Sequence, residues 1–415
     1  MENYISRTSR ERLMVFFSLF APVFFSTLIA GCTSIANYVD PPPMPVPVVE
    51  APAPAPEPVA PPPPPPPPLP VAEREQDKDD KIEPVKGAVL TRVYYATNRT
   101  RDGRTFGSGL NDVGSGMSYG SVVVSLPENR AKGEIPLKPI YIPYSNNAAR
   151  KYVLLYPLKS LSKDQFFRTL SNATLKVPKN AAFIYIHGYN NSFDDAARRT
   201  GQIAVDLELP VVPVMYSWPS LAYKVAYKKD LMNAEASVDR LAVFLREFAI
   251  NSEAKQIFVI AHSMGNLVTT KAMRTLLQEN PVLSSKFTQV ILAAPDIDPE
   301  IFRVDIAPQF SKLKMPITIY TSRRDRALMA SSVYHTGWKN KPRLGHPDSL
   351  ADIIDGFDFI DASDIPTNFM GHDYIGSNRK LLSDMKILFL KGVRASGREG
   401  LSGYPMPLPN RWRFP

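Results

Sequence analysis

Apolar positions follow two spacings between about residues 89 and 393. Short apolar runs predict buried strands, and most are followed by stretches in which apolar residues recur every three or four positions, as in amphipathic helices. Residues 100–120 are rich in glycine, show no helical period and predict a loop. The strands expected are 89–97, 121–126, 152–157, 183–186, 211–216, 257–261, 290–294, 317–320 and 357–360. The helices expected are 161–170, 194–207, 231–248, 267–277 and 381–390.

This alternation predicts the fold class. Strands that are apolar along their whole length, separated by helices, are typical of a mostly parallel central sheet with helices on both faces. We therefore expect an α/β fold over residues 88–393. Ligands of such sheets bind beyond the carboxyl ends of the strands, so residues that directly follow a strand are the candidates for a functional site.

The strongest candidate follows the run 257–261. That run ends in Ala261-His262-Ser263-Met264-Gly265, after which the helical spacing begins. A buried strand, a serine flanked by small residues and a helix form the nucleophile elbow of α/β hydrolases. Ala261 and Gly265 are the small positions of that sharp turn. Ser263 is therefore the candidate nucleophile, which requires a base, an acid and donors for an oxyanion.

The donors are expected on two loops. The backbone N–H of Met264, directly after the serine, would supply one of them. The other is expected after the strand 183–186, which leads into His187-Gly188-Tyr189. Gly188 would let the backbone approach a substrate closely, so we assign the second donor to the N–H of Tyr189. His187 and Gly188 would shape this oxyanion loop.

The base should be a histidine that follows the acid in the chain, because α/β hydrolases carry the order serine, acid, histidine. His187 precedes Ser263, and the side chain of His262, its neighbour on the elbow, is expected to point away. His372 lies in a loop before the last predicted helix, where this fold carries its base. His372 is our prediction, with His346 as the alternative.

Two carboxylates follow strands between the serine and this histidine. Asp325 follows the strand 317–320, and Asp296 follows the strand 290–294. Either could orient the imidazole and stabilise its cation. The later strand is the common position, so Asp325 is preferred and Asp296 is the alternative.

The first residues predict an export signal. Three arginines among residues 1–12 precede an uncharged apolar stretch, 13–30, that ends at Gly31-Cys32. This arrangement is typical of a secretory signal, and Ile29-Ala-Gly-Cys32 resembles the lipobox of bacterial lipoproteins. We expect a signal peptide over 1–31 and lipidation of Cys32, with an uncleaved transmembrane anchor as the alternative. Residue 33 is Thr rather than Asp, and the resemblance to lipoprotein sorting in Gram-negative bacteria then implies an outer-membrane lipoprotein facing the periplasm.

A spacer is expected over residues 32–87. Eighteen of the chain's 41 prolines lie in 41–70, and a charged stretch follows at 73–83. Proline lacks an N–H and fixes φ, so the proline-rich part would form a semi-rigid polyproline II stalk. The charged linker is expected to be disordered, and the tail 394–415 to be loosely ordered.

Composition narrows the function further. The formal net charge is +9, but no basic stripe is interleaved with aromatic residues, so nucleic-acid binding is not expected. Cys32 is the single cysteine, and no Cys/His group has zinc-ligand spacing. We expect neither a metal nor a cofactor.

Six motifs together resemble a bacterial family of α/β hydrolases of unknown function. They are Tyr94-Tyr-Ala-Thr-Asn-Arg99, Tyr185-Ile-His-Gly-Tyr-Asn190, Ser217-Trp-Pro-Ser220, Ala261-His-Ser-Met-Gly265, Ala293-Ala-Pro-Asp-Ile-Asp298 and Gly371-His-Asp-Tyr374. The resemblance spans about residues 89–390 and implies a serine hydrolase with a lipase- or esterase-like triad. The role of Thr97-Asn98-Arg99 is open, and we expect a structural one with Arg99 paired to an acid.

These residues predict a serine hydrolase that cleaves carboxylic esters through an acyl-enzyme on Ser263. The substrate would be a small-molecule or lipid acyl ester, and the lipid on Cys32 would hold the protein on the membrane. Two alternatives remain: an acyltransferase, thioesterase or amidase with the same triad, and a non-catalytic envelope binding module on a hydrolase scaffold.

Overall fold

The computed structural model describes residues 83–415, apart from 113, 115, 311–316, 338–340, 350–353, 355, 367–371, 373 and 405–409. The expected signal peptide, Cys32 and the proline-rich spacer lie outside the described residues. Within the described part, the helices are too short or too polar to cross a membrane.

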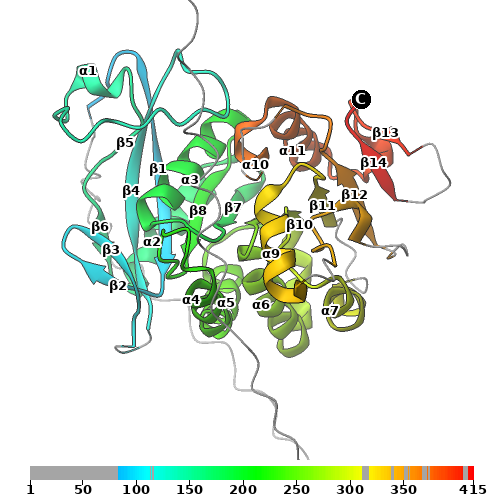
Figure 1. Ribbon diagram of the computed structural model, residues 1–415. Coiled ribbons are helices and arrows are strands. Elements are labelled where there is room, and N and C mark those ends of the chain that lie inside the picture. The colour runs from blue at the N-terminus through cyan, green and yellow to red at the C-terminus, as the bar shows by residue number, and fades with distance from the viewer. Residues whose placement is uncertain are drawn as a thin grey trace, which may run out of the picture. The chain divides into compact units, whose positions relative to one another are not determined.

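A twelve-stranded sheet forms the centre of the fold (Figure 1), in the order β13-β14-β12-β11-β10-β9-β7-β8-β1-β4-β5, with β6 paired to β4. The strands from β14 to β1 in this order run parallel, and β13, β4, β5 and β6 are antiparallel additions. Their bounds are β1 Ala88–Thr97, β4 Ser118–Pro127, β5 Leu154–Leu155, β6 Lys159–Leu161, β7 Ala181–Ile186, β8 Val212–Ser217, β9 Gln256–His262, β10 Phe287–Ala293, β11 Ile317–Thr321, β12 Phe357–Asp361, β13 Ser402–Gly403 and β14 Arg411–Arg413. The predicted mostly parallel sheet is thereby confirmed.

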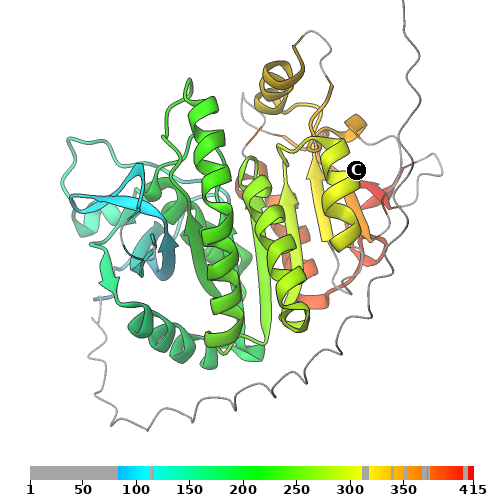
Figure 2. The ribbon, with the colours of Figure 1, turned by 90° about the horizontal axis from the view of Figure 1, so that it is seen from below.

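Helices cover both faces of this sheet. In Figure 1, α3 (Phe193–Leu207) and α11 (Arg379–Lys391) lie on one face. Figure 2 shows the other face, covered by α5 (Val238–Asn251) and α6 (Gly265–Glu279). Phe166 of α2 (Lys163–Leu175) packs into the same core as these two helices. The remaining helical segments are α1 Asn146–Ala149, α4 Tyr227–Ala236, α7 Pro299–Ile301, a π-helical turn Phe302–Ile306, α8 Ala307–Phe310, α9 Arg326–Thr336, α10 Tyr374–Ser377 and the 3₁₀ turns Pro178–Asn180, Pro281–Lys286, Pro347–Ser349 and Ala395–Gly397.

The covering explains why the central strands are apolar throughout. Side chains of a strand alternate between its two faces, and in β7 Phe183 enters the core under α3 and α11, whereas Ile184 enters the core under α5 and α6. The same holds for Phe258 and Val259 of β9. A polar residue in either register would have lost its water without gaining a partner.

The prediction of a loop over residues 100–120 is wrong in part. It forms a hairpin of β2 (Arg99–Asp102) and β3 (Thr105–Leu110), and then the start of β4. Its charged residues Arg101, Asp102 and Arg104 are exposed, as are Ser108 and Gly109 of β3. Phe106 anchors it, because that ring is buried against Tyr95 and Phe193, with centroids 5.6 and 4.8 Å away.

Two further expectations differ from the structure. The single helix predicted over 231–248 is two helices, α4 and α5, which meet at Ser237. The Ser237 hydroxyl donates to the carbonyl of Asn233 and accepts from Asn98 Nδ2, at 2.6 and 2.8 Å. The tail expected to be loosely ordered instead contributes β14, which pairs with β12 from Arg411 to Arg413 and is followed by the buried Phe414.

Candidate active site

The elbow forms where β9 ends and α6 begins. Ser263 has φ 53°, a left-handed conformation that costs a residue with a side chain about 1 kcal/mol or more. Its N–H donates to Ala293 O across the turn at 2.9 Å. A Cβ on Gly265 would lie 2.3 Å from His187 O, so position 265 has to be glycine for α6 to start this close to β7. Ala261 is fully buried in the same core.

The loop after β7 passes directly over the serine. A Cβ on Gly188 would lie 2.7 Å from Ser263 Cβ and 3.0 Å from His262 O. Glycine is therefore required here by the close approach of two backbones. The loop places the next peptide group, with the N–H of Tyr189, beside the elbow.

Both expected oxyanion donors lie at this junction. Met264 begins α6 as its N-cap residue and is fully buried. Tyr189 and Ser263 line one pocket. Neither the N–H of Tyr189 nor that of Met264 donates a hydrogen bond to another described residue. An oxyanion hole requires backbone donors without a protein acceptor beside the nucleophile, and here the nucleophile candidate Ser263 is 3 % exposed and lines the pocket.

The structure brings Asp325 and His372 together. His372 Nδ1 lies 2.7 Å from Asp325 Oδ2 and 2.9 Å from Oδ1. Asp325 follows β11, is 1 % exposed, and caps α9 by accepting the Leu328 N–H at 3.0 Å. A histidine that an acid orients through Nδ1 exchanges protons through its Nε2. His372 and Ser263 line the same pocket.

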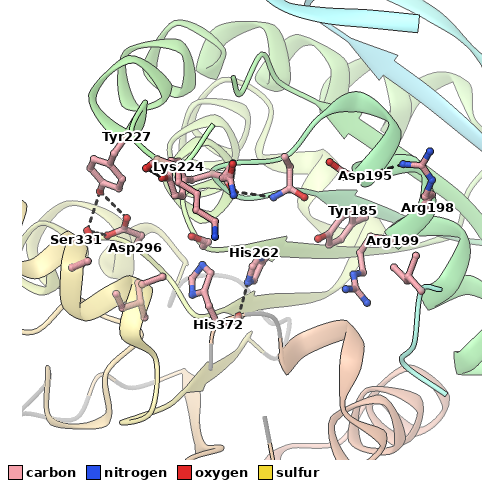
Figure 3. Close-up of a pocket in the computed structure, with 18 of the residues that line it drawn as sticks. Tyr185, Asp195, Arg198, Arg199, Lys224, Tyr227, His262, Asp296, Ser331 and His372 are labelled. Carbon is pink, nitrogen blue, oxygen red and sulfur yellow. Dashed lines mark hydrogen bonds and ion pairs between the residues drawn. The ribbon is translucent and has the colours of Figure 1, made fainter. Parts of the chain in front are cut away.

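His262 was expected to point away from the geometry that the base needs, and in the structure its side chain lines the pocket and contacts the loop of His372. Its Nε2 donates to the backbone carbonyl of His372 at 3.0 Å, and the two rings lie 4.7 Å apart (Figure 3). The elbow itself thereby contacts the loop that carries the expected base. Sequence gave no signal for this contact, because His372 lies 110 residues further along the chain.

Asp296, the alternative acid, contacts other residues. It is 4 % exposed, and its Oδ1 accepts from Arg343 Nε at 2.7 Å and from Ser331 Oγ at 2.5 Å. Its Oδ2 accepts from the Tyr227 hydroxyl at 2.7 Å. The carboxylate therefore ties α4 to α9 and forms part of the pocket wall (Figure 3).

The two other histidines that follow Ser263 in the chain, His335 and the alternative base His346, also contact other residues. His335 Nε2 lies 3.0 Å from the Tyr227 hydroxyl, and burial lowers the pKa of His335. His346 Nδ1 accepts from the N–H of Asp348 at 3.2 Å. The histidines that line the pocket with Ser263 are His262 and His372.

The pocket at this edge of the sheet has a volume of about 710 Å³. In Figure 3, Tyr227, Ser331 and Asp296 lie at one end, and Arg198, Arg199 and Tyr185 lie at the other, with His262 and His372 between them. Apolar side chains contribute to its walls: Ile135, Leu137, Ala327, Leu328 and Ala330. The space matches the size of ordinary small-molecule sites.

A cluster that the sequence did not predict holds the expected oxyanion loop, His187–Tyr189. The side chain of Trp218 stacks on His187 at 5.0 Å and donates from Nε1 to His187 O at 2.7 Å. Arg99 also reaches this loop, and its hydrogen-bond acceptors among the described residues are carbonyl, hydroxyl and imidazole atoms. The expected pairing of Arg99 with an acid is therefore not a direct contact. The signals were the two unassigned motifs, Tyr94–Arg99 and Ser217–Ser220.

No group of three side chains that could hold a metal ion lies within the described residues.

Comparison with known proteins agrees with this architecture. The family described as "Alpha/beta hydrolase of unknown function (DUF900)" matches residues 162–390. None of the curated proteins matches the chain.

Solved structures of hydrolases give distant matches. A predicted CIB-like hydrolase from Thermoplasma acidophilum is 13% identical over 57% of this chain and 91% of that one, with a TM-score of 0.30. An esterase from Pyrobaculum calidifontis is 12% identical over 65% and 80%, also at 0.30. A carboxylesterase from Bacillus subtilis is 10% identical over 55% and 98%, at 0.28. At these values the matches carry no argument about the fold, the substrate or the residue roles of this protein. The family match, which covers more than half of the chain, establishes that this protein belongs to the α/β-hydrolase family of that description.

Proposed function

We propose that this protein is a serine hydrolase that cleaves carboxylic esters through an acyl-enzyme. Ser263 is the nucleophile, His372 the general base and Asp325 the residue that orients it. The observation that carries the proposal is the contact of 2.7 Å between His372 Nδ1 and Asp325 Oδ2, because His372 lines the same pocket as the elbow serine. Three loops distant in sequence thus supply the three residue types of a hydrolytic triad in one place.

The reaction would proceed by two similar steps. His372 Nε2 takes the proton of Ser263 as its Oγ attacks the acyl carbonyl, and the N–H groups of Tyr189 and Met264 stabilise the oxyanion. The imidazolium, stabilised by Asp325, then gives its proton to the departing alcohol and leaves an acyl-Ser263. Water attacks that ester with the same base, which restores the hydroxyl and releases the acid.

Two measurements on the chain from about residue 80 test this proposal. The protein should hydrolyse p-nitrophenyl butyrate, and Ser263→Ala should lower kcat by about 10⁴-fold or more. A fluorophosphonate probe should label Ser263 in the parent and not in the variant. Equal hydrolysis by both proteins would overturn the assignment, and a parent that neither hydrolyses nor reacts would favour a binding module. Adding an alcohol and analysing products separates acyl transfer from hydrolysis.

The site of action is a separate proposal, supported by the residues 1–33 alone. We propose that the protein is lipidated on Cys32 and anchored in the outer membrane, facing the periplasm. In cells supplied with labelled palmitate, the full chain should carry label, and Cys32→Ala should not. A full-length protein without label that fractionates with the cytoplasm would contradict this proposal.

A further inference from the structure

A buried polar cluster lies behind the oxyanion loop, and the proposed mechanism leaves it without a role. At its centre is Arg99, which follows β1 and is 1 % exposed. A buried guanidinium is costly unless its donors are satisfied. Burial lowers the pKa of Arg99 to about 9, while Asp230, Asp195 and Asp194 act on it from a distance and oppose that change. Because burying a guanidinium costs free energy, we looked for a role of Arg99 besides packing.

Arg99 joins three segments of backbone. Its NH2 donates to Asn191 O at 2.8 Å, at the end of the oxyanion loop. Its NH1 donates to Ser220 O and to Gly107 O, both at 2.9 Å. The guanidinium therefore ties the oxyanion loop to the segment after β8 and to the hairpin of β2 and β3.

The remaining contacts of Arg99 form a chain with one direction. Arginine can only donate hydrogen bonds, so Arg99 Nε donates to Ser217 Oγ at 2.9 Å. The Ser217 hydroxyl is then free to donate its own hydrogen to His187 Nε2, at 3.1 Å. Arg99 NH2 lies 3.4 Å from the same nitrogen. Because arginine only donates, this contact requires Nε2 of His187 to be an acceptor, and the Ser217 hydroxyl then donates to the same nitrogen.

That requirement decides the tautomer of His187. Burial, reinforced by Arg99, lowers the pKa of His187 to about 3, so the ring is neutral at ordinary pH. With Nε2 as acceptor, the ring hydrogen sits on Nδ1, which donates to Gly188 O at 2.8 Å. Asn191 Nδ2 donates to the same carbonyl at 3.3 Å.

The carbonyl of Gly188 belongs to the same peptide group as the N–H of Tyr189. A trans peptide is planar, and its C=O and N–H point in opposite directions. Holding Gly188 O on the side of His187 therefore directs the Tyr189 N–H to the opposite side. If the carbonyl were free, this peptide could rotate and the donor would be lost.

We propose that Arg99 is a positioning residue, which acts through Ser217 and His187 to orient the Tyr189 N–H as an oxyanion donor. The inference rests on the proposed function, because the oxyanion arises in that reaction. It assigns a role to the motif Tyr94–Arg99 and to Ser217 at the start of the second unassigned motif. These hydrogen bonds transfer no proton; they fix the orientation of the peptide group between Gly188 and Tyr189.

Kinetics of four variants at three positions test the proposal. Ser217→Ala breaks the chain with a small change in volume, and Arg99→Lys keeps the charge but loses the planar set of donors. Both should lower kcat for p-nitrophenyl butyrate by about 10- to 100-fold with little change in KM, because a donor to the oxyanion acts mainly in the transition state. His187→Asn, whose amide can replace the Nδ1 donor, should keep more activity than His187→Leu.

Arg398→Lys is the matched control. Arg398 is as deeply buried as Arg99, but its partners are Asp384 and Asp358, at 3.1 and 3.7 Å, away from the pocket. It should lose stability and keep its kcat. If Ser217→Ala and Arg99→Lys both fold and keep kcat within about twofold of the parent, the proposal is overturned. Should Arg99→Lys fail to fold, Ser217→Ala decides alone.

A measurement without turnover separates this proposal from the proposed function. In ¹⁵N NMR of the parent, His187 should be neutral with its hydrogen on Nδ1 at pH 7. A hydrogen on Nε2, or a charged ring, would overturn the chain of donors even in an active enzyme. A parent that shows the expected tautomer but neither hydrolyses esters nor reacts with the probe would overturn the proposed function instead.

Discussion

Asp325 holds His372 through both of its carboxylate oxygens, at 2.7 and 2.9 Å from Nδ1, and it also caps α9 through the N–H of Leu328. Asp296, on the neighbouring strand end, is bound instead to Arg343, Ser331 and Tyr227. The two carboxylates follow neighbouring strands of the sheet, yet Asp325 contacts an imidazole, whereas Asp296 links the helices α4 and α9.

The two aspartates should respond differently to the same substitution. Asp325→Asn should lower kcat by about 10⁴-fold, because an amide cannot stabilise the imidazolium and favours the wrong tautomer. Asparagine is a good N-cap residue, so α9 should persist. Asp296→Asn should keep kcat within about tenfold and lose stability by about 3 kcal/mol, because Arg343 loses its charged partner. Ester hydrolysis and urea unfolding of both variants measure this contrast, and a larger loss of kcat in Asp296→Asn would reverse the assignment of the acid.

Gly188 should not tolerate a methyl group. In Gly188→Ala the new Cβ would lie 2.7 Å from Ser263 Cβ, and the loop would have to move away from the serine. A displacement of the donor by a fraction of an ångström should lower kcat by about 10²-fold. Gly403→Ala is the control, because the nearest atom to its Cβ would be 3.9 Å away. Equal ester hydrolysis by Gly188→Ala and the parent would show that the loop does not need this close approach.

The backbone of Ser263 stores strain that can be measured. Ser263→Ala and Ser263→Gly both remove the nucleophile, but only glycine adopts φ 53° without cost. Ser263→Gly should therefore be more stable than Ser263→Ala by about 1 kcal/mol. Thermal or urea unfolding of the two inactive proteins gives the difference directly. Should Ala prove the more stable of the two, the elbow does not hold this conformation.

His187 should make the fold sensitive to acid. Its pKa is about 3 in the folded protein, against 6.5 for a free histidine, because the buried ring next to Arg99 resists charging. Below pH 6.5 the unfolded chain binds a proton that the folded chain does not, so stability is lost as the pH falls from 6.5 towards 3. The contribution of this one residue is about 1.4 kcal/mol per pH unit.

The comparison with His187→Asn isolates that contribution, because all carboxylates titrate equally in both proteins. The difference in unfolding free energy between parent and variant should shift by about 1.4 kcal/mol per pH unit between pH 6 and 4.5. Urea unfolding at several pH values measures it. Parallel curves for the two proteins would mean that His187 titrates normally in the folded state.

The sequence by itself determined the fold class and the order in which the candidate serine, acid and histidine follow one another along the chain. Apolar runs such as 183–186 and 257–261 predict strands covered on both faces, because no polar residue can be buried there without a partner. Glycine at 188 and at 265 marks the two places where backbones approach, and Ser263 stands between them. These features are local, and local steric rules suffice to interpret them.

Only the tertiary structure decided which partners meet. Asp325 and Asp296 both follow strands, and nothing in their local sequence distinguishes them. They differ in the folded protein, where Asp296 binds Arg343 and Asp325 binds His372. Likewise, the link from Arg99 to His187 joins residues 88 positions apart, and the contact between His262 and His372 spans 110. Such contacts depend on which strand ends lie side by side in the sheet, and that order is set by packing over the whole chain rather than by any one segment.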